Sequence, residues 1–532
     1  MVAAENLGIR VLDTRHEATA VFAADAVARL RRGFGVAVVT AGPGAAPTLL
    51  QKRGALQDID QITLMRPLCK YVARITRVKE IIPILKEAIC VAQSGTPGPV
   101  FVEMPVDVLY PYGLVIKEVG VFKDATSLAH KARNLYLMAH ICRQFGGNWF
   151  AQELTPRIVT VPLPNDSDIQ KATDLLLKAK KPVMIMGSQA VLPPTDLYDL
   201  VSAVKHIGIP VYLGGMSRGL LGVDCTIQMH YCRKENLKEA DLIILAGTVC
   251  DFRLSYGHDL SRHAAVVAVN RSSSQLFRNE GQFWRVTLAI QADVATTLVH
   301  ISRRLYYTEK QHALIAQWVN DLKKKDEAKI AENVGKMRNK YIGDRINPLR
   351  LLSLINEVLP KDALLIADGG DFVASAAYIV RPRGPLQWLD PGAFGTLGVG
   401  AGFALGARVV HPNRPVVILF GDGACGFSFM DLDTFVRHKL GVLVFIGNDA
   451  CWSQIARGQL AMFNSSVAVN LLDTRYDNVA AALGAAGKLI SPENGLTRVQ
   501  FEELFASAAL GETVVANVLI GKTDFRAGSM SV

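Results

Sequence analysis

The sequence lacks several features that would place it in a specialised class of protein. Its 8 cysteines form no Cys-x-x-Cys pair, which argues against a zinc site and a disulfide framework and favours a reducing compartment. No apolar run approaches the roughly 20 residues that cross a bilayer, and residues 1–10 lack the charged-then-apolar order of a signal peptide. Low-complexity tracts and short repeats are also missing. These absences predict an ordinary soluble, globular protein.

Positive charge is in excess, but it is not concentrated. The net charge is +10, and the densest basic cluster, residues 323–325, lies beside Asp321 and Glu327. Mixed charge of this kind is typical of a solvated helix face. We therefore expect no nucleic-acid partner.

The length and the hydrophobic pattern predict an α/β protein of three domains. A chain of 532 residues exceeds one core at about 150 residues per domain. Short β-branched runs alternate with amphipathic helical stretches, which is typical of doubly wound parallel sheets. The predicted strands are residues 36–40, 100–102, 183–186, 242–246, 265–269, 364–367, 416–420, 442–446 and 514–520.

Two breaks divide the pattern. The first is the stretch 110–166, which we expect to be irregular, and the second is the charged helical segment 314–345. The predicted domains are therefore 1–112, 166–305 and 346–532.

The third domain carries polar residues at the ends of two predicted strands. Strand 416–420 runs into Gly421-Asp422-Gly423, and strand 442–446 runs into Asn448-Asp449 after a gap of 24 residues. Neighbouring parallel strands bring such residues to one edge of a sheet, where ligands bind. Free backbone N–H groups there suit a phosphate, and a carboxylate suits a divalent cation. A lone Gly-Asp-Gly is also an ordinary turn.

This spacing resembles the thiamine-diphosphate signature of the acetolactate-synthase-like superfamily, a Gly-Asp-Gly followed by Asn-Asn. The resemblance implies that Asp422 and Asp449 bind Mg²⁺, that the carbonyl of Cys451 completes the protein ligands, and that the metal holds the diphosphate. This chain has Asp449 where the family has a second Asn, so Asn448 is kept as an alternative ligand.

The glycine-rich stretch 389–402 does not have the G-x-G-x-x-G order of a dinucleotide site. It resembles the family segment that bends the cofactor, which implies that the Gly395 carbonyl accepts a hydrogen bond from the 4′-amino group and that Leu397 wedges between the rings. The alternative for Gly400, Gly402 and Gly406 is close packing of a helix. The same resemblance assigns further cofactor contacts to Gly370, Asp371, Phe372, Gly421, Gly423, Ala424 and Trp452, although a carboxylate at 371 beside an anion is unexplained.

The first domain carries Glu17 at the start of an alanine-rich helix, 18–30. By composition Glu17 is a helix-start carboxylate that favours the positive end of the helix dipole, and His16 is a structural neighbour. The order Arg15-His16-Glu17, helix, strand and Ala-Gly-Pro-Gly resembles the pyrimidine-binding domain of the same superfamily. That resemblance implies that Glu17 contacts the aminopyrimidine nitrogen and activates the cofactor. It also implies that Gln57 polarises the substrate, with a surface position as the alternative.

The first domain is shorter than the family pattern. The resemblance implies a further strand and helix before residue 1, and a helix and strand of about 20 residues between Gly44 and Leu49, neither of which this sequence contains. Missing strands expose apolar faces and unpaired edges, so we expect an incomplete and fragile first domain.

The middle domain resembles the superfamily's central domain, which holds FAD in acetolactate synthases. Strand-end glycines serve folding as well as ligands, so FAD binding stays open. Candidates to meet a phosphate are Arg218, Arg253, Asn270 and Arg271.

The choice of reaction depends on two positions. Acetolactate synthases carry a Met and a Trp after the Asn pair to select a second keto acid, whereas this chain has Gln454 and Gly458. The departure favours cleavage of a 2-hydroxyacyl-CoA to an aldehyde and formyl-CoA, as the 2-hydroxyacyl-CoA lyase group does. The alternatives are carboligation of 2-keto acids and a non-catalytic member of the fold.

The resemblance also implies an assembly and a location. The family forms homodimers or homotetramers in which the pyrimidine-binding domain of one subunit faces the diphosphate-binding domain of another, so Glu17 and Asp422 of one site would belong to different chains. Similar proteins are held in the endoplasmic reticulum membrane by an N-terminal anchor, which this sequence does not show.

Overall fold

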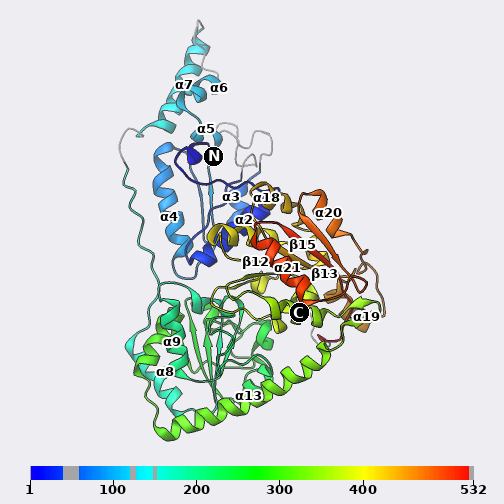
Figure 1. Ribbon diagram of the computed structural model, residues 1–532. Helices are drawn as coiled ribbons and strands as arrows, with labels where there is room; N and C mark the ends of the chain where they lie inside the picture. Colours follow the sequence, from blue (N-terminus) through cyan, green and yellow to red (C-terminus); the bar gives the residue numbers. More distant parts are fainter. Residues whose placement is uncertain (1, 40–58, 120–126, 148–151, 527–532) are drawn as a thin grey trace. The chain divides into compact units, whose positions relative to one another are not determined.

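The computed structural model describes residues 2–39, 59–119, 127–147 and 152–526 (Figure 1). They form two compact units, one made of residues 1–37 with 162–532 and the other of residues 38–161. Within the described ranges, every helix is too short or too polar to cross a membrane.

The C-terminal part of the first unit is a six-stranded, fully parallel sheet in the order β11-β10-β12-β13-β15-β14. Alternate residues of β12 (Val416–Gly421) pack into different apolar clusters, Val417 and Leu419 into one and Ile418 and Phe420 into the other. Helices therefore cover both faces, as in doubly wound sheets. The other strands are β10 Leu364–Asp368, β11 Trp388–Leu389, β13 Leu443–Asn448, β14 Ala486–Ile490 and β15 Val514–Leu519, and the helices are α14 Pro348–Val358, α15 Gly370–Ile379, α16 Val399–Val410, α17 Asp422–Cys425, α18 Leu432–Arg437, α19 Ser453–Phe463, α20 Tyr476–Ala482 and α21 Arg498–Ala509.

The central domain is a second parallel sheet, in the order β4-β3-β5-β6-β7. Its three middle strands are buried along almost their whole length, which explains why they read as continuous apolar runs. The strands are β3 Pro182–Met186, β4 Val211–Leu213, β5 Leu242–Ala246, β6 Ala265–Asn270 and β7 Leu288–Gln291, and the helices are α8 Asp166–Lys178, α9 Leu197–Ile207, α10 Arg233–Glu239, α11 Ser273–Leu276 and α12 Val294–Arg304.

The long helix α13, Glu309–Met337, leads from the central sheet toward the C-terminal one (Figure 1). The hairpin of β8 (Tyr341–Ile342) with β9 (Arg345–Ile346) follows it.

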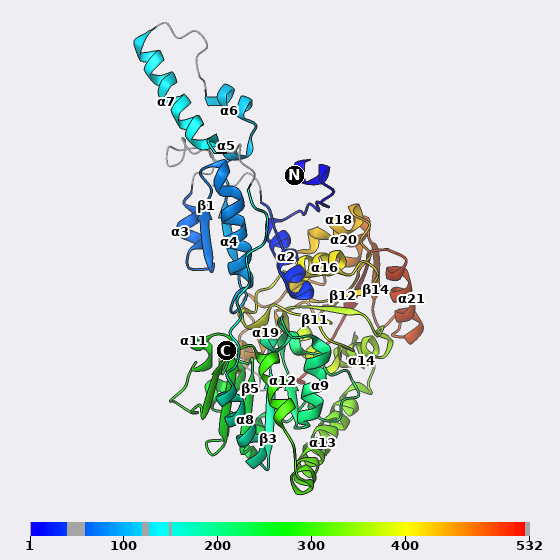
Figure 2. The same ribbon diagram turned by 90° about the vertical axis from the view of Figure 1, so that its left-hand side faces the viewer.

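The N-terminal helix α2 (Glu17–Arg31) packs on α16 within the same unit (Figure 2). A Cβ placed on Gly402 would lie 2.5 Å from Cβ of Phe22, and one on Gly406 would lie 2.4 Å from the Ala23 carbonyl oxygen. The glycines of α16 are therefore explained by close helix packing. Because residues 19–22 face 402 and residues 23–26 face 406, the two helices run in the same direction.

The second unit is small. Its described strands are a parallel pair, β1 Tyr71–Arg74 and β2 Val100–Glu103. Its helices are α3 Gln61–Met65, α4 Ile81–Gln93, α5 Val106–Leu109, α6 Tyr112–Val119 and α7 Leu128–Phe145. The short helix α1, Val2–Asn6, belongs to the first unit.

Two expectations about local structure were wrong. Residues 36–39, the described part of the predicted strand 36–40, are not in a strand, and the stretch 110–166 contains α6 and α7 rather than irregular chain. In the first case the β-branched residues Val36, Val38 and Val39 are exposed, and a strand needs a partner strand as well as propensity. The strands predicted from 100 onwards all form, within a few residues of the expected ends.

Candidate cofactor and metal site

The polar residues predicted to share a sheet edge do so. β12 and β13 are parallel neighbours with Gly421 opposite Gly447. Asp422 opens α17 directly after β12, and Asn448 ends β13. The tertiary structure therefore brings Asp422 and Asp449 to the carboxyl edge of the sheet, from positions 27 residues apart in the sequence.

Asp422 is a buried carboxylate, 4% exposed. It accepts hydrogen bonds from the backbone N–H of Gly423 (2.8 Å) and of Cys451 (3.2 Å). Burial and then the neighbouring Asp449 raise its pKa to about 7. Burial also raises the pKa of Asp449, whose carboxylate accepts a hydrogen bond from the Ser453 hydroxyl. Two carboxylates that disfavour each other's charge are stabilised by a cation between them.

The donor set suits a hard divalent cation rather than a transition metal. Among the described residues no group of three or more His, Cys, Asp and Glu side chains gathers. A cation at Asp422 and Asp449 would thus complete its shell with neutral oxygens, such as a backbone carbonyl, and with oxygens of a bound ligand, as Mg²⁺ does at phosphate sites.

The Asn448 side chain forms hydrogen bonds within the protein. Its amide N–H₂ donates to the Thr474 carbonyl (3.1 Å) and to Oδ1 of Asn517 (3.2 Å), and its Oδ1 accepts from the N–H of Ala450. The side chain is fully buried. These bonds favour Asp449 over Asn448 as the metal ligand.

The remaining predicted contacts surround this edge. A Cβ on Gly423 would lie 2.4 Å from the Trp452 ring, and a Cβ on Gly447 would lie 2.5 Å from the Phe372 ring. Gly369 has a φ of +65°, and a Cβ there would lie 2.2 Å from the Leu397 side chain. The structure thus places Leu397, Phe372 and Trp452 around the same strand ends.

The carboxylate at position 371 has a partner that sequence reasoning missed. Asp371 forms an ion pair with Arg457 of α19. Charge neutralisation by Arg457 makes an acidic residue compatible with an anion nearby. Arg457 lies 86 positions further along the chain, so no local motif signals the pair.

Asp368 is a second group that the sequence did not single out. It is 0% exposed and accepts hydrogen bonds from the N–H groups of Gly398 (3.0 Å) and Gly400 (2.7 Å). Burial raises its pKa to about 7. The carboxyl group anchors the start of α16 and with it the loop that carries Gly395 and Leu397.

Glu17 lies at the first position of α2, and His16 caps the helix by accepting a hydrogen bond from the N–H of Ala18. The Glu17 side chain is 72% exposed. Because α2 and α16 run in the same direction, Glu17 lies at the end of the pair that also carries Leu397. Hydrogen bonds from the Arg15 N–H and the Thr19 hydroxyl to Asp431 hold this end of α2. Gln57 lies outside the described residues.

Most of the central-domain residues considered as phosphate ligands form hydrogen bonds or ion pairs within the protein. Arg271 is fully buried and paired with Asp293 at 2.5 Å, so its guanidinium is engaged inside the protein. Asn270 is buried and accepts from Gln189 and Ser272, and Arg253 pairs with Asp251. Arg218 donates to the Ala377 carbonyl and lines a cavity.

Comparison with known proteins identifies three family models along the chain. The N-terminal thiamine pyrophosphate (TPP) binding domain of thiamine pyrophosphate enzymes matches residues 1–57, the central domain matches 169–301 and the C-terminal TPP binding domain matches 368–517. Thiamine pyrophosphate is the same molecule as thiamine diphosphate.

Several relatives match over almost the whole chain. The 2-hydroxyacyl-CoA lyase 2 of Caenorhabditis elegans is 56% identical over 557 positions, covering 100% of this chain and 87% of the relative. That of Homo sapiens is 46% identical, with 100% and 87% covered. An acetolactate synthase large subunit of Mycobacterium tuberculosis is 30% identical, with 96% and 89% covered. The first alignment is 25 positions longer than this chain of 532 residues, so this relative contains residues without a counterpart here.

Proposed function

Since the chain belongs to the thiamine pyrophosphate enzymes and is a thiamine-pyrophosphate-dependent lyase, we propose that it cleaves 2-hydroxyacyl-CoA to an aldehyde and formyl-CoA with Mg²⁺ as its metal. The assignment of the metal and the cofactor is supported by the buried pair of carboxylates at the ends of β12 and β13. The observation that favours the CoA substrate is the set of relatives named 2-hydroxyacyl-CoA lyase 2.

In the proposed site, Asp422, Asp449 and the carbonyl of Cys451 hold Mg²⁺. When bound, thiamine diphosphate supplies the electron sink for breaking the carbon–carbon bond. Leu397 and the Gly395 carbonyl orient its rings, and the carboxyl of Glu17 holds a proton at the aminopyrimidine nitrogen, so that positioning replaces a strong base. Gln57 is proposed to polarise the substrate carbonyl.

The surroundings of Gly458 support a lyase over a carboligase. Gly458 lies on α19, on the same helix as Arg457. Among the described residues outside its own helix backbone, a Cβ there would meet only the Met462 terminal methyl, at 3.6 Å. The position at which acetolactate synthases carry a Trp is therefore open, which suits a long acyl chain better than a second small keto acid.

One assay separates the candidate reactions. The enzyme with thiamine diphosphate and Mg²⁺ is given a 2-hydroxyacyl-CoA, with aldehyde and formyl-CoA measured, or pyruvate, with acetolactate measured. We expect the first pair of products, their loss in Asp422→Ala, and normal rates in Asp199→Ala, which changes an exposed aspartate of α9. Acetolactate as the main product would contradict the proposal. A non-catalytic protein would show neither product, and the melting temperature would report whether it still binds the cofactor.

For the central domain, FAD is the less favoured cofactor because Asn270, Arg253 and Arg271 are engaged in internal hydrogen bonds and ion pairs. The proposed location at the endoplasmic reticulum membrane is supported only by the resemblance.

For the assembly, we propose a homodimer in which α2 of one chain serves the site of the other. In the structure Gly402 and Gly406 of α16 closely contact α2 of the same chain, so the model requires that α2 of the partner take this place in the dimer. Mixing Glu17→Gln chains with Asp422→Ala chains should restore one intact site per mixed dimer. If mixed dimers form without activity, both residues of a site belong to one chain.

A further inference from the structure

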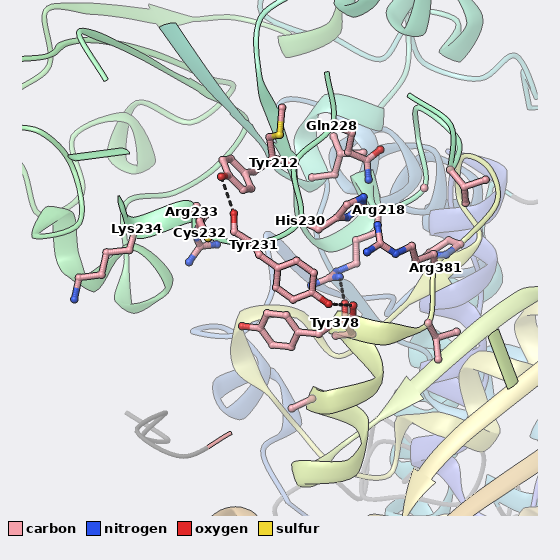
Figure 3. Close-up of a pocket in the computed structure, with 18 of the residues that line it drawn as sticks. Tyr212, Arg218, Gln228, His230, Tyr231, Cys232, Arg233, Lys234, Tyr378 and Arg381 are labelled. Atoms are coloured by element: carbon pink, nitrogen blue, oxygen red, sulfur yellow. Dashed lines mark hydrogen bonds between the residues drawn. The ribbon is translucent and has the colours of Figure 1, made fainter. Parts of the chain in front are cut away.

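A cavity of about 530 Å³ lies in the first unit, between the central domain and the end of α15 (Figure 3). One wall is formed by Arg218 and by the segment 228–235 that leads into α10. The other wall is formed by Tyr378 and Arg381 at the C-terminal end of α15. Its volume falls in the range of small-molecule sites.

The cavity collects positive charge. Arg218, Arg233 and Arg381 line it, and burial lowers the pKa of Arg218. Arg218 donates to the Ala377 carbonyl at 2.8 Å and lies over the Trp388 ring. Within the described part of the chain, neither Arg218 nor Arg381 has a carboxylate oxygen within 4.0 Å. Buried or half-buried cations normally have anionic partners, so these two arginines indicate an anionic ligand.

Two carboxylates act on this charge at longer range, Asp390 on Arg218 and Asp326 on Arg381, and among the described residues neither forms an ion pair with these arginines. Burial, Arg381 and Arg218 lower the pKa of His230 to about 3, so it is neutral at pH 7. The Asp326 carboxylate accepts the backbone N–H groups of His230 (2.9 Å) and Tyr231 (2.6 Å). Glu235 lines the cavity from an exposed position on α10.

Two tyrosines provide a flat apolar surface beside the arginines. The rings of Tyr231 and Tyr378 stack with centroids 6.1 Å apart and an interplanar angle of 19°. The Tyr231 hydroxyl donates to the Tyr378 carbonyl at 2.9 Å, as Figure 3 shows. Tyr378 remains 48% exposed. An aromatic ring next to arginines is the combination that binds a purine base and its phosphates.

The walls are held in place without a ligand. Gly219, next to Arg218, has a φ of +80°, and a Cβ there would lie 2.5 Å from the Gly384 carbonyl oxygen. Asp326 fixes the segment 228–235 of the same wall through its two backbone hydrogen bonds. The backbone that carries Arg218 and Tyr231 is therefore ordered before a ligand binds, which saves part of the entropic cost.

The position of the cavity relative to the proposed site sets the kind of ligand. α15 begins with Gly370 and Asp371 at the cofactor edge and ends beside Tyr378. A helix of 10 residues spans roughly 15 Å at 1.5 Å per residue. A ligand bound in the cavity would thus need a long arm to place a reacting carbon at the cofactor.

We propose that this cavity binds the phosphorylated nucleotide end of a CoA thioester, with the base against Tyr378 and the phosphates on Arg218 and Arg381. The proposal rests on the proposed function, because the thioester is the substrate named there. A free adenine nucleotide has the same recognition chemistry and is the other source to be tested.

Calorimetry on the enzyme saturated with thiamine diphosphate and Mg²⁺ tests the site with three probes: CoA, adenosine 3′,5′-bisphosphate and ADP. We expect CoA and the bisphosphate to compete, and Arg381→Met to weaken both by about ten- to a hundredfold, as loss of a charged hydrogen bond does. The KM for 2-hydroxyacyl-CoA should rise by a similar factor with little change in kcat. Arg383→Met removes a charge two residues away, where the side chain donates to the Asn356 carbonyl and does not line the cavity in the described part of the chain. It should change neither quantity.

Other results would contradict either the cavity assignment or the proposed reaction. Unchanged CoA affinity in Arg381→Met, and in Tyr378→Leu as a second variant with its melting temperature checked, would overturn the proposal. A second result would also overturn it: Arg381→Met weakens ADP binding but leaves the KM for the thioester unchanged. The site would then serve a free nucleotide. Because binding is measured without turnover, Arg381-dependent CoA binding in an enzyme that does not cleave the thioester would contradict the proposed reaction and not the cavity.

Discussion

Replacing Asp368 by Asn should change how the stability of the C-terminal domain depends on pH. Burial raises the pKa of the folded carboxyl from 3.8 to about 7. Between these values the folded domain keeps a proton that the unfolded chain has lost, so the free energy of unfolding falls as pH rises. At about 1.4 kcal/mol per pH unit, the total loss is about 4 kcal/mol, complete near pH 7.

The Asn variant has the same shape and does not titrate. It offers one acceptor for the two N–H groups of Gly398 and Gly400, which costs about 1–3 kcal/mol for an unsatisfied buried donor. That cost does not vary with pH. The stability of the wild type relative to the variant should therefore decrease from pH 4 to 7 and be constant above.

Hydrogen exchange of the β10 and β12 amides is the suitable assay, because it reports opening of this domain in a chain that does not unfold in one step. Asp199→Asn, at an exposed position of α9, is the matched control and should leave the pH profile unchanged. A difference between wild type and Asp368→Asn that stays constant from pH 4 to 8 would refute the assignment of Asp368 as a buried, proton-binding carboxyl.

Four further outcomes are expected. Asp422→Ala should abolish Mg²⁺-dependent binding of thiamine diphosphate in calorimetry, because the diphosphate loses its counter-ion; an unchanged affinity would be inconsistent with this metal site. Glu17→Gln should bind the cofactor but slow hydrogen–deuterium exchange at the thiazolium carbon, and normal exchange would return Glu17 to a helix-start role. Arg457→Met should weaken cofactor affinity because Asp371 loses its ion pair, and the added change Asp371→Asn should restore it if charge is the cause. Gly402→Leu should lower the free energy of unfolding by about 1–3 kcal/mol or more through overpacking against Phe22, seen as a lower melting temperature, whereas Gly335→Leu, at an exposed position of α13 where a Cβ has no neighbour within 4 Å among the described residues, should not lower it.

Much of the fold was predictable because its cause is local. Strands buried on both faces are continuous apolar runs, so 242–246, 416–420 and 514–520 were recognisable before the tertiary structure was known. The order strand, Gly-Asp-Gly, strand, Asn-Asp places two carboxylates at one sheet edge whenever the strands are parallel neighbours, and the pairing of β12 with β13 confirms this. The valines at 36, 38 and 39 show the limit, because strand propensity without a partner strand produced no strand.

The sequence by itself determined the α/β class, the positions of the main strands, and the residue types that suit a diphosphate and a divalent cation. Each of these depends on side-chain periodicity or on the chemistry of one short motif. Only the tertiary structure decided that Arg457 neutralises Asp371, that Asp368 anchors the loop of Leu397, that Arg271 is engaged by Asp293, and that Arg218 and Arg381 face one cavity. The residues brought together in this way are 22 positions apart in the sequence for Arg271 and Asp293 and more than 150 positions apart for Arg218 and Arg381. Burial and charge pairing at such separations are set by how helices and sheets pack, and no periodicity along the chain reports that packing.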